Sequence, residues 1–425
     1  MRYTGGFRRG RLLASAAGGT CAAALLAGAV TAGVAGGPPA ASAAAEAVTR
    51  PASGVWVVEG RGFGHGRGMS QWGARAAAAG GRSAGQILGF YYPGTVRARI
   101  GNPTLRVRVG TDPELVVTPA PGLRVSWAGG RVALPARPTA AGADRWKVGA
   151  YARTLRLAYR TRAGWTWWGP VLPRRVSMAS SRPVLRVQWR DRTATEFRGV
   201  LAVTRAAGGS VVAVDRLPME SYLAGVVPRE SPASWPAPAL RAQAVAARTY
   251  AYAAVKRPRS SLYDLCDSTA CQVYGGARQL WPDGSRLSGE ERSTTAAVAG
   301  TRGVVLLSRG RPATTEYSAS NGGWSAAGGV PYLVARSDPY TAGDPYRSWA
   351  VRVKVADVGR KFGFSRLDRL RVVARTGRGH WGGRVLDVEL VGLDGVGKPR
   401  AVRVSGGAVR SALGLRSTYF RVRRP

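Results

Sequence analysis

Short runs of alternating apolar and polar residues between residues 96 and 200 restrict the fold of this chain more than any other feature. Examples are TLRVRVG, GLRVSW, TLRLAYR and VLRVQW, with glycines and prolines between them. Successive side chains of a strand point to opposite faces, so each run has one apolar face. The pattern predicts antiparallel strands joined by short turns, and we expect residues 96–195 to form a β-rich domain without helices.

Helical signals flank this segment. Residues 69–81 (MSQWGARAAAAGG) predict a short helix with Ser70 as its N-cap and two glycines as its stop, and residues 84–95 predict a second helix. Residues 237–255 predict a longer helix because alanine is the strongest helix former, whereas the prolines at 228, 232 and 236 exclude regular helix before it. Further strands after residue 300 complete an expected α+β fold.

The first 45 residues have the layout of an export signal. Four arginines lie among the first 11 residues, an Ala- and Gly-rich stretch follows, and Ala41-Ser42-Ala43 is a suitable cleavage site. The pair Arg8-Arg9 is compatible with a twin-arginine signal. We expect residues 1–45 to be a signal peptide and residues 46–54 a linker. The mature protein is then extracellular or in the cell wall, and it meets the membrane only transiently through the signal segment.

The chain is strongly basic, with 63 Lys and Arg residues against 23 Asp and Glu residues and a net charge of +40. Such a charge favours anionic partners. The positive residues are spread along the chain and form no run like that of a nucleic-acid-binding arm. We therefore expect no nucleic-acid partner.

Two cysteines, Cys266 and Cys271, lie beyond the signal segment. In an oxidising compartment, two cysteines so close in sequence favour a disulfide. A zinc site is the alternative, but it needs more ligands, and the chain contains only two histidines, His65 and His380.

A glycine run, GRGFGHGRG, occupies residues 60–68 and holds His65 at its centre. No register of the run fits the dinucleotide fingerprint, and no lysine follows as in a Walker A loop. Alternating glycines in an extended segment leave one face without side chains, so backbone or ligand can approach closely. His65 either faces a ligand from the opposite side or holds the loop through hydrogen bonds.

Two long motifs make the chain resemble the SpoIID/LytB family of sporulation proteins and amidase enhancers. They are LPMESYLAGVVPRESPASWPAPALRAQAVAARTYA (217–251) and the glycine run continued by MSQWGA. In the sporulation proteins the glycine run follows the LGL-RST-F element, whereas here it precedes the β-rich segment. We expect residues 196–425 to form the SpoIID/LytB domain, with residues 55–95 packed on it beside Glu230.

The resemblance implies a lytic transglycosylase that cleaves the glycan strands of peptidoglycan, with Glu230 as its catalytic residue. The amidase enhancers of the family imply the alternative, a wall-binding protein that catalyses no reaction and stimulates a cell-wall amidase. Some members bind zinc through a histidine and two cysteines, but the matching histidine is missing here. We therefore expect no metal and no cofactor.

The residues around Glu230 permit this role. Val226, Val227 and Trp235 provide apolar neighbours that would raise the pKa of the carboxyl group, and the prolines favour a loop to present it. Arg229 is expected to point away. Glu220 is the rival acid, although an acidic residue in the first turn of a helix is also favoured by the helix dipole.

The remaining candidates would form the walls of a glycan groove. Gln243 and Arg248 follow on the predicted long helix, and Arg248 has an alternative role as partner of a buried carboxylate such as Asp267. Residues 317–321 are either a polar wall or a strand end held by hydrogen bonds. The predicted substrate-binding residues are His65, Gln71, Trp235, Gln243, Arg248, Tyr317, Ser320, Asn321 and Trp324.

Overall fold

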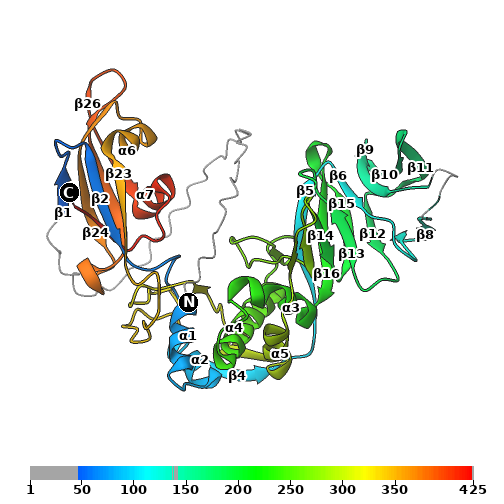
Figure 1. Cartoon of the computed structure of the whole chain (residues 1–425), viewed down its shortest axis with the longest axis horizontal. Helices are drawn as coiled ribbons and strands as arrows, with labels where there is room; N and C mark the ends of the chain where they lie inside the picture. Colours follow the sequence, from blue (N-terminus) through cyan, green and yellow to red (C-terminus); the bar gives the residue numbers. More distant parts are fainter. Residues whose placement is uncertain (1–45, 136, 138–141, 424–425) are drawn as a thin grey trace, which may run out of the picture. The chain divides into compact units, whose positions relative to one another are not determined.

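The computed structural model describes residues 46–135, 137 and 142–423, so the expected signal peptide lies outside the described residues. Helices and strands are mixed throughout, which confirms the α+β class. No helix in the described part of the chain is both long and apolar enough to cross a membrane. Figure 1 shows the order of the elements along the chain.

Two antiparallel sheets form the β-rich part (Figure 1). One has eight strands in the order β11-β10-β9-β6-β13-β14-β18-β19, and the other has seven in the order β17-β5-β16-β15-β12-β7-β8, in which only β17 pairs in parallel. Their bounds are β5 Thr104–Asp112, β6 Glu114–Val117, β7 Arg124–Trp127, β8 Gly130–Ala133, β9 Arg145–Tyr151, β10 Thr154–Thr161, β11 Gly164–Leu172, β12 Arg175–Ala179, β13 Leu185–Gln188, β14 Ala194–Phe197, β15 Val200–Arg205, β16 Val211–Pro218, β17 Leu265–Cys266, β18 Arg278–Leu280 and β19 Arg286–Ser288.

The expected boundary at residue 195 is not a boundary of the fold. It cuts through β14, and strands from both sides of it share both sheets. The reason is long-range pairing: β5 bonds along its length to β16, so the buried Leu105 and Val107 enter one core with Leu217 and Met219. As expected, no helix occurs in the described residues between 96 and 195.

A helical part surrounds the long helix α4. Ala244 and Ala247 of α4 enter the core of the β-rich part, whereas Ala242 and Ala246 pack with α1 and α2, because small side chains allow close approach on both faces. The elements are β3 Met69–Ser70, α1 Gln71–Ala79, α2 Ala84–Tyr91, β4 Val96–Arg99, α3 Met219–Glu230, α4 Ala237–Lys256, α5 Arg292–Gly300, β20 Val304–Ser308, β21 Arg311–Pro312 and β22 Tyr317–Ser318. The short helix η1 Ala207–Gly209 belongs instead to the β-rich part, where it connects β15 and β16.

The first and last described segments form a further pair of sheets over a separate apolar core. The four-stranded sheet has the order β1-β24-β25-β26, and the three-stranded sheet places β2 between β23 and β27. The bounds are β1 Glu46–Thr49, β2 Val55–Gly60, β23 Trp349–Lys354, α6 Val355–Lys361, β24 Arg366–Arg375, η2 His380–Gly382, β25 Val385–Leu393, β26 Pro399–Ser405, α7 Gly406–Leu413 and β27 Phe420–Arg423. The expected linker 46–54 is therefore wrong at its start, because β1 pairs with β24 and buries Val48.

The expected helices at 69–81, 84–95 and 237–255 correspond to α1, α2 and α4, and Ser70 caps α1 by accepting a hydrogen bond from the Gly73 N–H. The expected loop before residue 237 is wrong in its first part, because α3 continues through Pro228 to Glu230. Proline lacks an N–H, but a single missing hydrogen bond in the last turn does not end a helix that Val226 and Val227 anchor in the core. Glu230 is thus presented by a helix end.

Candidate active site around Glu230

The glycine run packs against the backbone of residues 316–322. The Phe63 N–H donates to the Ser320 carbonyl at 2.8 Å, and the Gly66 N–H donates to the Ser318 hydroxyl at 3.1 Å. The run is not the extended segment expected from its alternation, because Gly66 and Gly68 have φ values of 72° and 62°. Positive φ favours glycine at both positions, and a Cβ would also meet the Arg384 side chain at Gly66 and the Glu316 carbonyl oxygen at Gly68.

A pocket of about 680 Å³ lies between the glycine run, the end of α3 and residues 316–319. It contains four residues predicted for catalysis or substrate binding: His65, Gln71, Glu230 and Tyr317. The full lining is Phe63, Gly64, His65, Arg67, Gln71, Glu230, Tyr250, Arg259, Thr269, Ala270, Cys271, Val273, Glu316, Tyr317, Ser318, Ala319 and Arg410. The structure therefore brings the N-terminal motif to the residue for which a catalytic role is expected.

Glu230 is held by one strong and one weak hydrogen bond. Its Oε1 accepts from the Val273 N–H at 2.9 Å, and its Oε2 accepts from the Gln71 side chain at 3.4 Å. Burial raises the pKa of Glu230 above its usual value, and the bonds from Val273, Gln71 and Tyr317 partly offset this effect. No arginine or lysine forms an ion pair with Glu230 in the described part of the chain.

A relay of hydrogen bonds orients the Tyr317 hydroxyl. The Tyr222 hydroxyl donates to Gln272 Oε1 at 3.1 Å, and Gln272 Nε2 donates to the Tyr317 oxygen at 2.9 Å. Because the Tyr317 oxygen accepts this bond, its own proton is available for Glu230, the partner with which it also interacts. Gln272 thus fixes the direction of a third donor at the carboxyl group, after Val273 and Gln71.

The donor at Oε1, the Val273 N–H, lies directly after the loop closed by Cys266 and Cys271. The two cysteines are joined by a disulfide with their Cα atoms 5.5 Å apart. Cys271 itself lines the pocket, and Gln272 and Val273 follow it directly in the chain. The disulfide is therefore placed to restrain the segment that holds Glu230.

His65 lies in the pocket wall and also holds its own loop. Its Nδ1 accepts a hydrogen bond from the Arg67 N–H at 3.0 Å. Burial and the nearby cation of Arg67 lower the pKa of His65 to about 4, so the ring is neutral near pH 7. A neutral ring that accepts at Nδ1 carries its proton on Nε2, so His65 offers a donor there.

The second carboxylate of the pocket is neutralised. Glu316 accepts from Arg67 at both oxygens, with Arg67 Nη2 2.8 Å from Oε1. Burial opposes ionisation of Glu316, but the bonds from Arg67 bring its pKa below the usual value. Among the described pocket-lining residues, Glu230 is consequently the one carboxyl group free of an ion pair.

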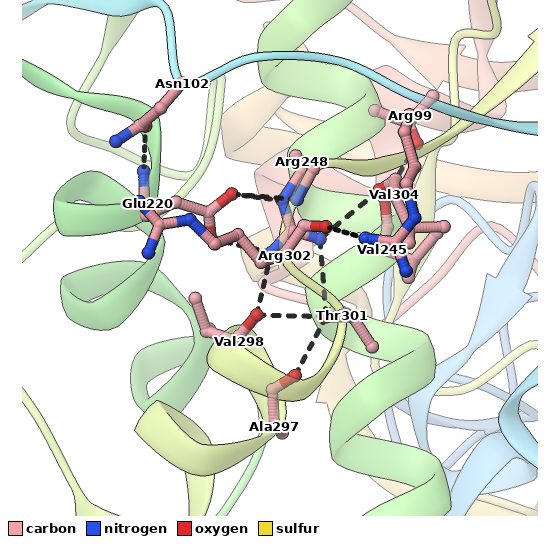
Figure 2. A network of polar contacts seen from close by, with 12 residues as sticks. Arg99, Asn102, Glu220, Val245, Arg248, Ala297, Val298, Thr301, Arg302 and Val304 are labelled. Carbon is pink, nitrogen blue, oxygen red and sulfur yellow. Dashed lines mark hydrogen bonds and ion pairs between the residues drawn. The ribbon is translucent and has the colours of Figure 1, made fainter.

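Arg248 does not reach the pocket, and the substrate-binding role predicted for it is wrong. The side chain is fully buried and forms a two-pronged ion pair with Glu220, at 2.9 and 2.8 Å (Figure 2). Its Nη1 donates to the Val304 carbonyl and to the Thr301 hydroxyl, and Nη2, which also binds Glu220, donates to the Val298 carbonyl. The suggested partner Asp267 is also wrong, and Glu220 is occupied as the structural partner of Arg248.

Four other predicted substrate-binding residues lie outside the pocket lining. Trp235 packs edge to face on Trp72 with ring centroids 5.1 Å apart, and Trp324 lines a separate cavity of about 170 Å³ beside Arg384. Ser320 and Asn321 are buried strand-end residues that donate to Asp344 and Asp338. Their side chains are turned inward by these bonds, so direct contact with a ligand in this pocket is not their role.

Gln243 lies behind the pocket. It is buried, and its Oε1 accepts weakly from Gln71 at 3.4 Å and from Ser231 at 3.5 Å. Arg229, expected to point away, donates to Gln279 and does not line the pocket. Gln243 therefore acts on Glu230 through Gln71.

Sequence reasoning missed four residues of this site: Arg67, Gln272, Val273 and Glu316. Arg67 lies within the glycine run, whereas Gln272, Val273 and Glu316 lie outside both quoted family motifs. Val273 acts through its backbone N–H, for which its side chain gives no signal. The Arg67–Glu316 pair joins positions 249 residues apart, and no local pattern predicts such a pair.

Substituting Gly68 with alanine is expected to lower the thermal unfolding temperature by several degrees. The new Cβ would lie 2.0 Å from the Glu316 carbonyl oxygen, in addition to the strain of a φ of 62°. Gly81→Ala is the matched control, because Gly81 has a φ of 81° but no atom within 4 Å of such a Cβ. Equal unfolding temperatures for the two variants would contradict the close packing of the glycine run.

Comparison with known proteins agrees with the motifs. The family model described as "Stage II sporulation protein" matches residues 207–307, which include α3, Glu230 and the disulfide loop. The chain is 39% identical over 135 residues to "Amidase enhancer" of Bacillus subtilis, covering 30% of this chain and 16% of that protein. It is 31% identical over 180 residues to "Stage II sporulation protein D" of the same organism, covering 38% and 50%.

A third relative, "Stage II sporulation protein D" of Bacillus amyloliquefaciens, is 29% identical over 228 residues, which cover 50% of this chain and 62% of that protein. The matched regions thus span less than two thirds of each of these relatives. The chain contains a SpoIID domain. Over these matched regions it is similar to the sporulation proteins and amidase enhancers of the SpoIID/LytB family.

Proposed function

We propose that this protein is an exported peptidoglycan-remodelling enzyme that cleaves glycan strands as a lytic transglycosylase, with Glu230 as its single acid and base. The observation that carries the proposal is the state of the two pocket carboxyl groups. Glu316 is neutralised by Arg67, whereas Glu230 is buried without an ion pair and has a raised pKa. Hydrolysis by the usual two-carboxylate route needs a second free carboxylate, which this pocket does not provide.

A lytic transglycosylase needs one carboxyl group. Protonated Glu230 gives its proton to the glycosidic oxygen, and the bond between that oxygen and C1 breaks. The 6-hydroxyl oxygen of the same sugar then bonds to C1, and its proton passes to the Glu230 carboxylate. The products are a 1,6-anhydro end and a new hydroxyl end, and Glu230 is again protonated.

The contacts of Glu230 suit this sequence. The Val273 N–H occupies Oε1, which leaves the weakly bonded Oε2 as the oxygen that carries the proton. Gln71 and Tyr317 donate to the carboxylate that forms after the first transfer, and such bonds favour the charged form. Neutral His65 can donate to a sugar hydroxyl from the opposite wall. Arg259 and Arg410 give the pocket a positive field for an anionic strand, since the charge of Arg67 is balanced by Glu316.

The proposed partner is the glycan strand of peptidoglycan, and the proposed location is the cell wall or the extracellular space. Both follow from the family and from the basic N-terminal segment with its cleavage site. No cofactor enters the proposed reaction.

The alternative is a wall-binding protein that stimulates a cell-wall amidase and performs no chemistry. The 39% identity to the protein named "Amidase enhancer" favours it. In that case Glu230 would serve binding or stability, and its ionisation would have no effect on product formation.

The test is the nature of the new strand ends. The mature protein is incubated with intact peptidoglycan and with peptidoglycan stripped of its stem peptides, and the products are analysed by mass spectrometry. New 1,6-anhydro ends support the transglycosylase, and new reducing ends would instead indicate hydrolysis. Unchanged strands, together with stimulation of an added cell-wall amidase, would favour the enhancer.

The pH dependence of cleavage follows from the raised pKa of Glu230. The reactive form is the protonated acid, so kcat/KM is expected to be high below this pKa and to fall as the pH rises through it. Tyr317→Phe removes a hydrogen bond that lowers the pKa, so the fall is expected at a higher pH in this variant. A pH profile of initial rates for both proteins tests this, and an unchanged or downward-shifted fall in Tyr317→Phe would contradict the assignment.

A further inference from the structure

A second candidate surface lies on the eight-stranded sheet and belongs to none of the family motifs. One face of β9, β10 and β11 carries cations interleaved with aromatic rings. Lys147 lies over Trp165 and Trp167 at 4.5 and 5.6 Å from the ring centroids, and Arg156 lies over Trp167 at 4.9 Å. We call this set of residues the ladder: Lys147, Tyr151, Arg156, Arg160, Trp165 and Trp167.

The strand register places the ladder on the solvent side. Arg160 pairs with Trp165, and Ala158 pairs with both Trp167 and Lys147, so these side chains share one face. The alternate residues of β10, Leu155 and Leu157, are buried in the core. The rings are exposed nevertheless, with 39% of Trp165, 45% of Trp167 and 43% of Tyr151 accessible. Exposed tryptophans grouped in this way are uncommon on a surface without a binding role.

A hollow of about 490 Å³ continues the ladder. Trp165 and Arg160 belong to its wall, together with residues of β6, β13 and the following turn. The full lining is Asp112, Glu114, Leu115, Val116, Arg145, Arg160, Trp165, Gln188, Trp189, Arg190 and Arg192.

The positive charges of the ladder and hollow exceed the negative ones. Three ion pairs are internal: Arg160 with Asp144, Lys147 with Glu114, and Arg190 with Asp112. Arg145 donates to the Asp144 carbonyl oxygen at 2.6 Å and to Gln188, and the charge of Asp144 also acts on it. Within the described part of the chain, Arg156 and Arg192 form no ion pair with a carboxylate. Arg156 also has a buried Nε without a hydrogen-bond partner. Two guanidinium groups are thus available for an anionic ligand.

We propose that the ladder and its hollow are a second glycan-binding site, which takes peptidoglycan strands whose lactyl carboxylates are free. The identity of this ligand rests on the proposed function. In a strand without stem peptides, every second sugar carries one carboxylate, so apolar ring faces and single charges alternate. Indole rings contact the C–H faces of sugars, and guanidinium groups bind carboxylates through two hydrogen bonds.

The charge pattern distinguishes this ligand from a polymer with a phosphate on every unit. Asp112, Glu114 and Asp144 lie among the cations. Closely spaced phosphates would meet these carboxylates at short range, and like charges repel. A strand with sparse charges can place its carboxylates at the two unpaired arginines, Arg156 and Arg192.

The test is the binding of full-length Glu230→Gln protein, which cannot cleave the proposed substrate, to peptide-free glycan strands. A variant with Trp165→Ala and Trp167→Ala is expected to bind roughly tenfold more weakly or worse. Arg156→Gln with Arg192→Gln keeps the rings and is expected to show a similar loss, together with a weaker dependence on salt. The matched control is Leu386→Ala with Arg403→Gln, which removes one exposed apolar and one exposed basic side chain from β25 and β26.

Chemically modified ligands test whether the lactyl carboxylates are the groups that the arginines recognise. Strands whose lactyl carboxylates have been converted to amides are expected to bind the parent protein as weakly as untreated strands bind the arginine variant. Unchanged binding by both ladder variants would overturn the proposal. The proposal would also be overturned if the ladder variants lost affinity only for a polymer that carries phosphates, and bound the glycan strands as well as the parent protein does. The binding assay does not depend on cleavage. The ladder would therefore remain a glycan-binding site even if the wild-type protein formed no anhydro ends, and the two proposals can fail separately.

Discussion

Replacing Glu230 with glutamine is expected to lower the rate of anhydro-end formation by about 10²- to 10⁴-fold, the usual contribution of a general acid and base. Glutamine keeps the shape of the side chain, and its carbonyl oxygen can still accept from the Val273 N–H. It cannot transfer a proton at the pH of the reaction. The measurement is the initial rate of product formation on peptide-free glycan, analysed by mass spectrometry.

The control for this variant is Glu389→Gln. Glu389 pairs with Arg371 in the sheet of β24 and β25 and does not line the pocket, so its replacement removes a carboxylate without touching the site. Thermal unfolding of both variants is expected to resemble that of the parent, because neither change creates a cavity. If Glu230→Gln formed products at the wild-type rate, Glu230 would not be the catalytic acid and base. The non-catalytic amidase enhancer would then be the favoured function.

Replacing Arg248 with methionine is expected to lower the free energy of unfolding by about 3–5 kcal/mol, the range seen when one partner of a buried ion pair is removed. Methionine fills much of the same space, so the main loss is electrostatic. Glu220 would retain only the Gly303 N–H among its partners at the carboxylate, and the Val298 and Val304 carbonyls would lose a donor. Chemical denaturation followed by tryptophan fluorescence measures the change.

Arg403→Met is the comparison for this substitution. Arg403 pairs with Asp387, but its side chain is 66% exposed, and an exposed pair contributes about 0–1 kcal/mol. The folded fraction of Arg248→Met is expected to bind glycan normally, because the side chain lies outside the pocket. If Arg248→Met is as stable as Arg403→Met, the network in Figure 2 does not have the structural role assigned to it.

Local features of the fold could be predicted from the sequence. The boundaries of α1 follow from Ser70 and Gly80, and α4 follows from its alanines after Pro236. These elements are determined by residues within a turn of their ends, so a single sequence carries the signal. The expectation that α3 stops before Pro228 failed because core contacts of Val226 and Val227 outweigh one missing hydrogen bond.

The site was predictable only in part. The family motifs pointed to Glu230, Gln71 and His65, which line one pocket. The direction in which each side chain points could not be predicted from the motifs. Gln243 and Arg248 lie on the same helix, but a separation of five residues turns them to different faces, and only Gln243 lies next to the site. Ser320 and Asn321 are polar residues in a plausible motif, yet their bonds to buried carboxylates turn them inward.

The position of β2 has a consequence for the time at which the site can form. β2 leads directly into the glycine run and pairs with β27, while the Ser417 hydroxyl donates to the Arg61 carbonyl across a separation of 356 residues. The pocket wall that contains the glycine run must therefore wait until β27, more than 350 residues further along the chain, has been synthesised. Contacts of such long range are the slowest to form. A chain cut short before β27 would leave this wall unsupported, so the site can form only after that strand has been made.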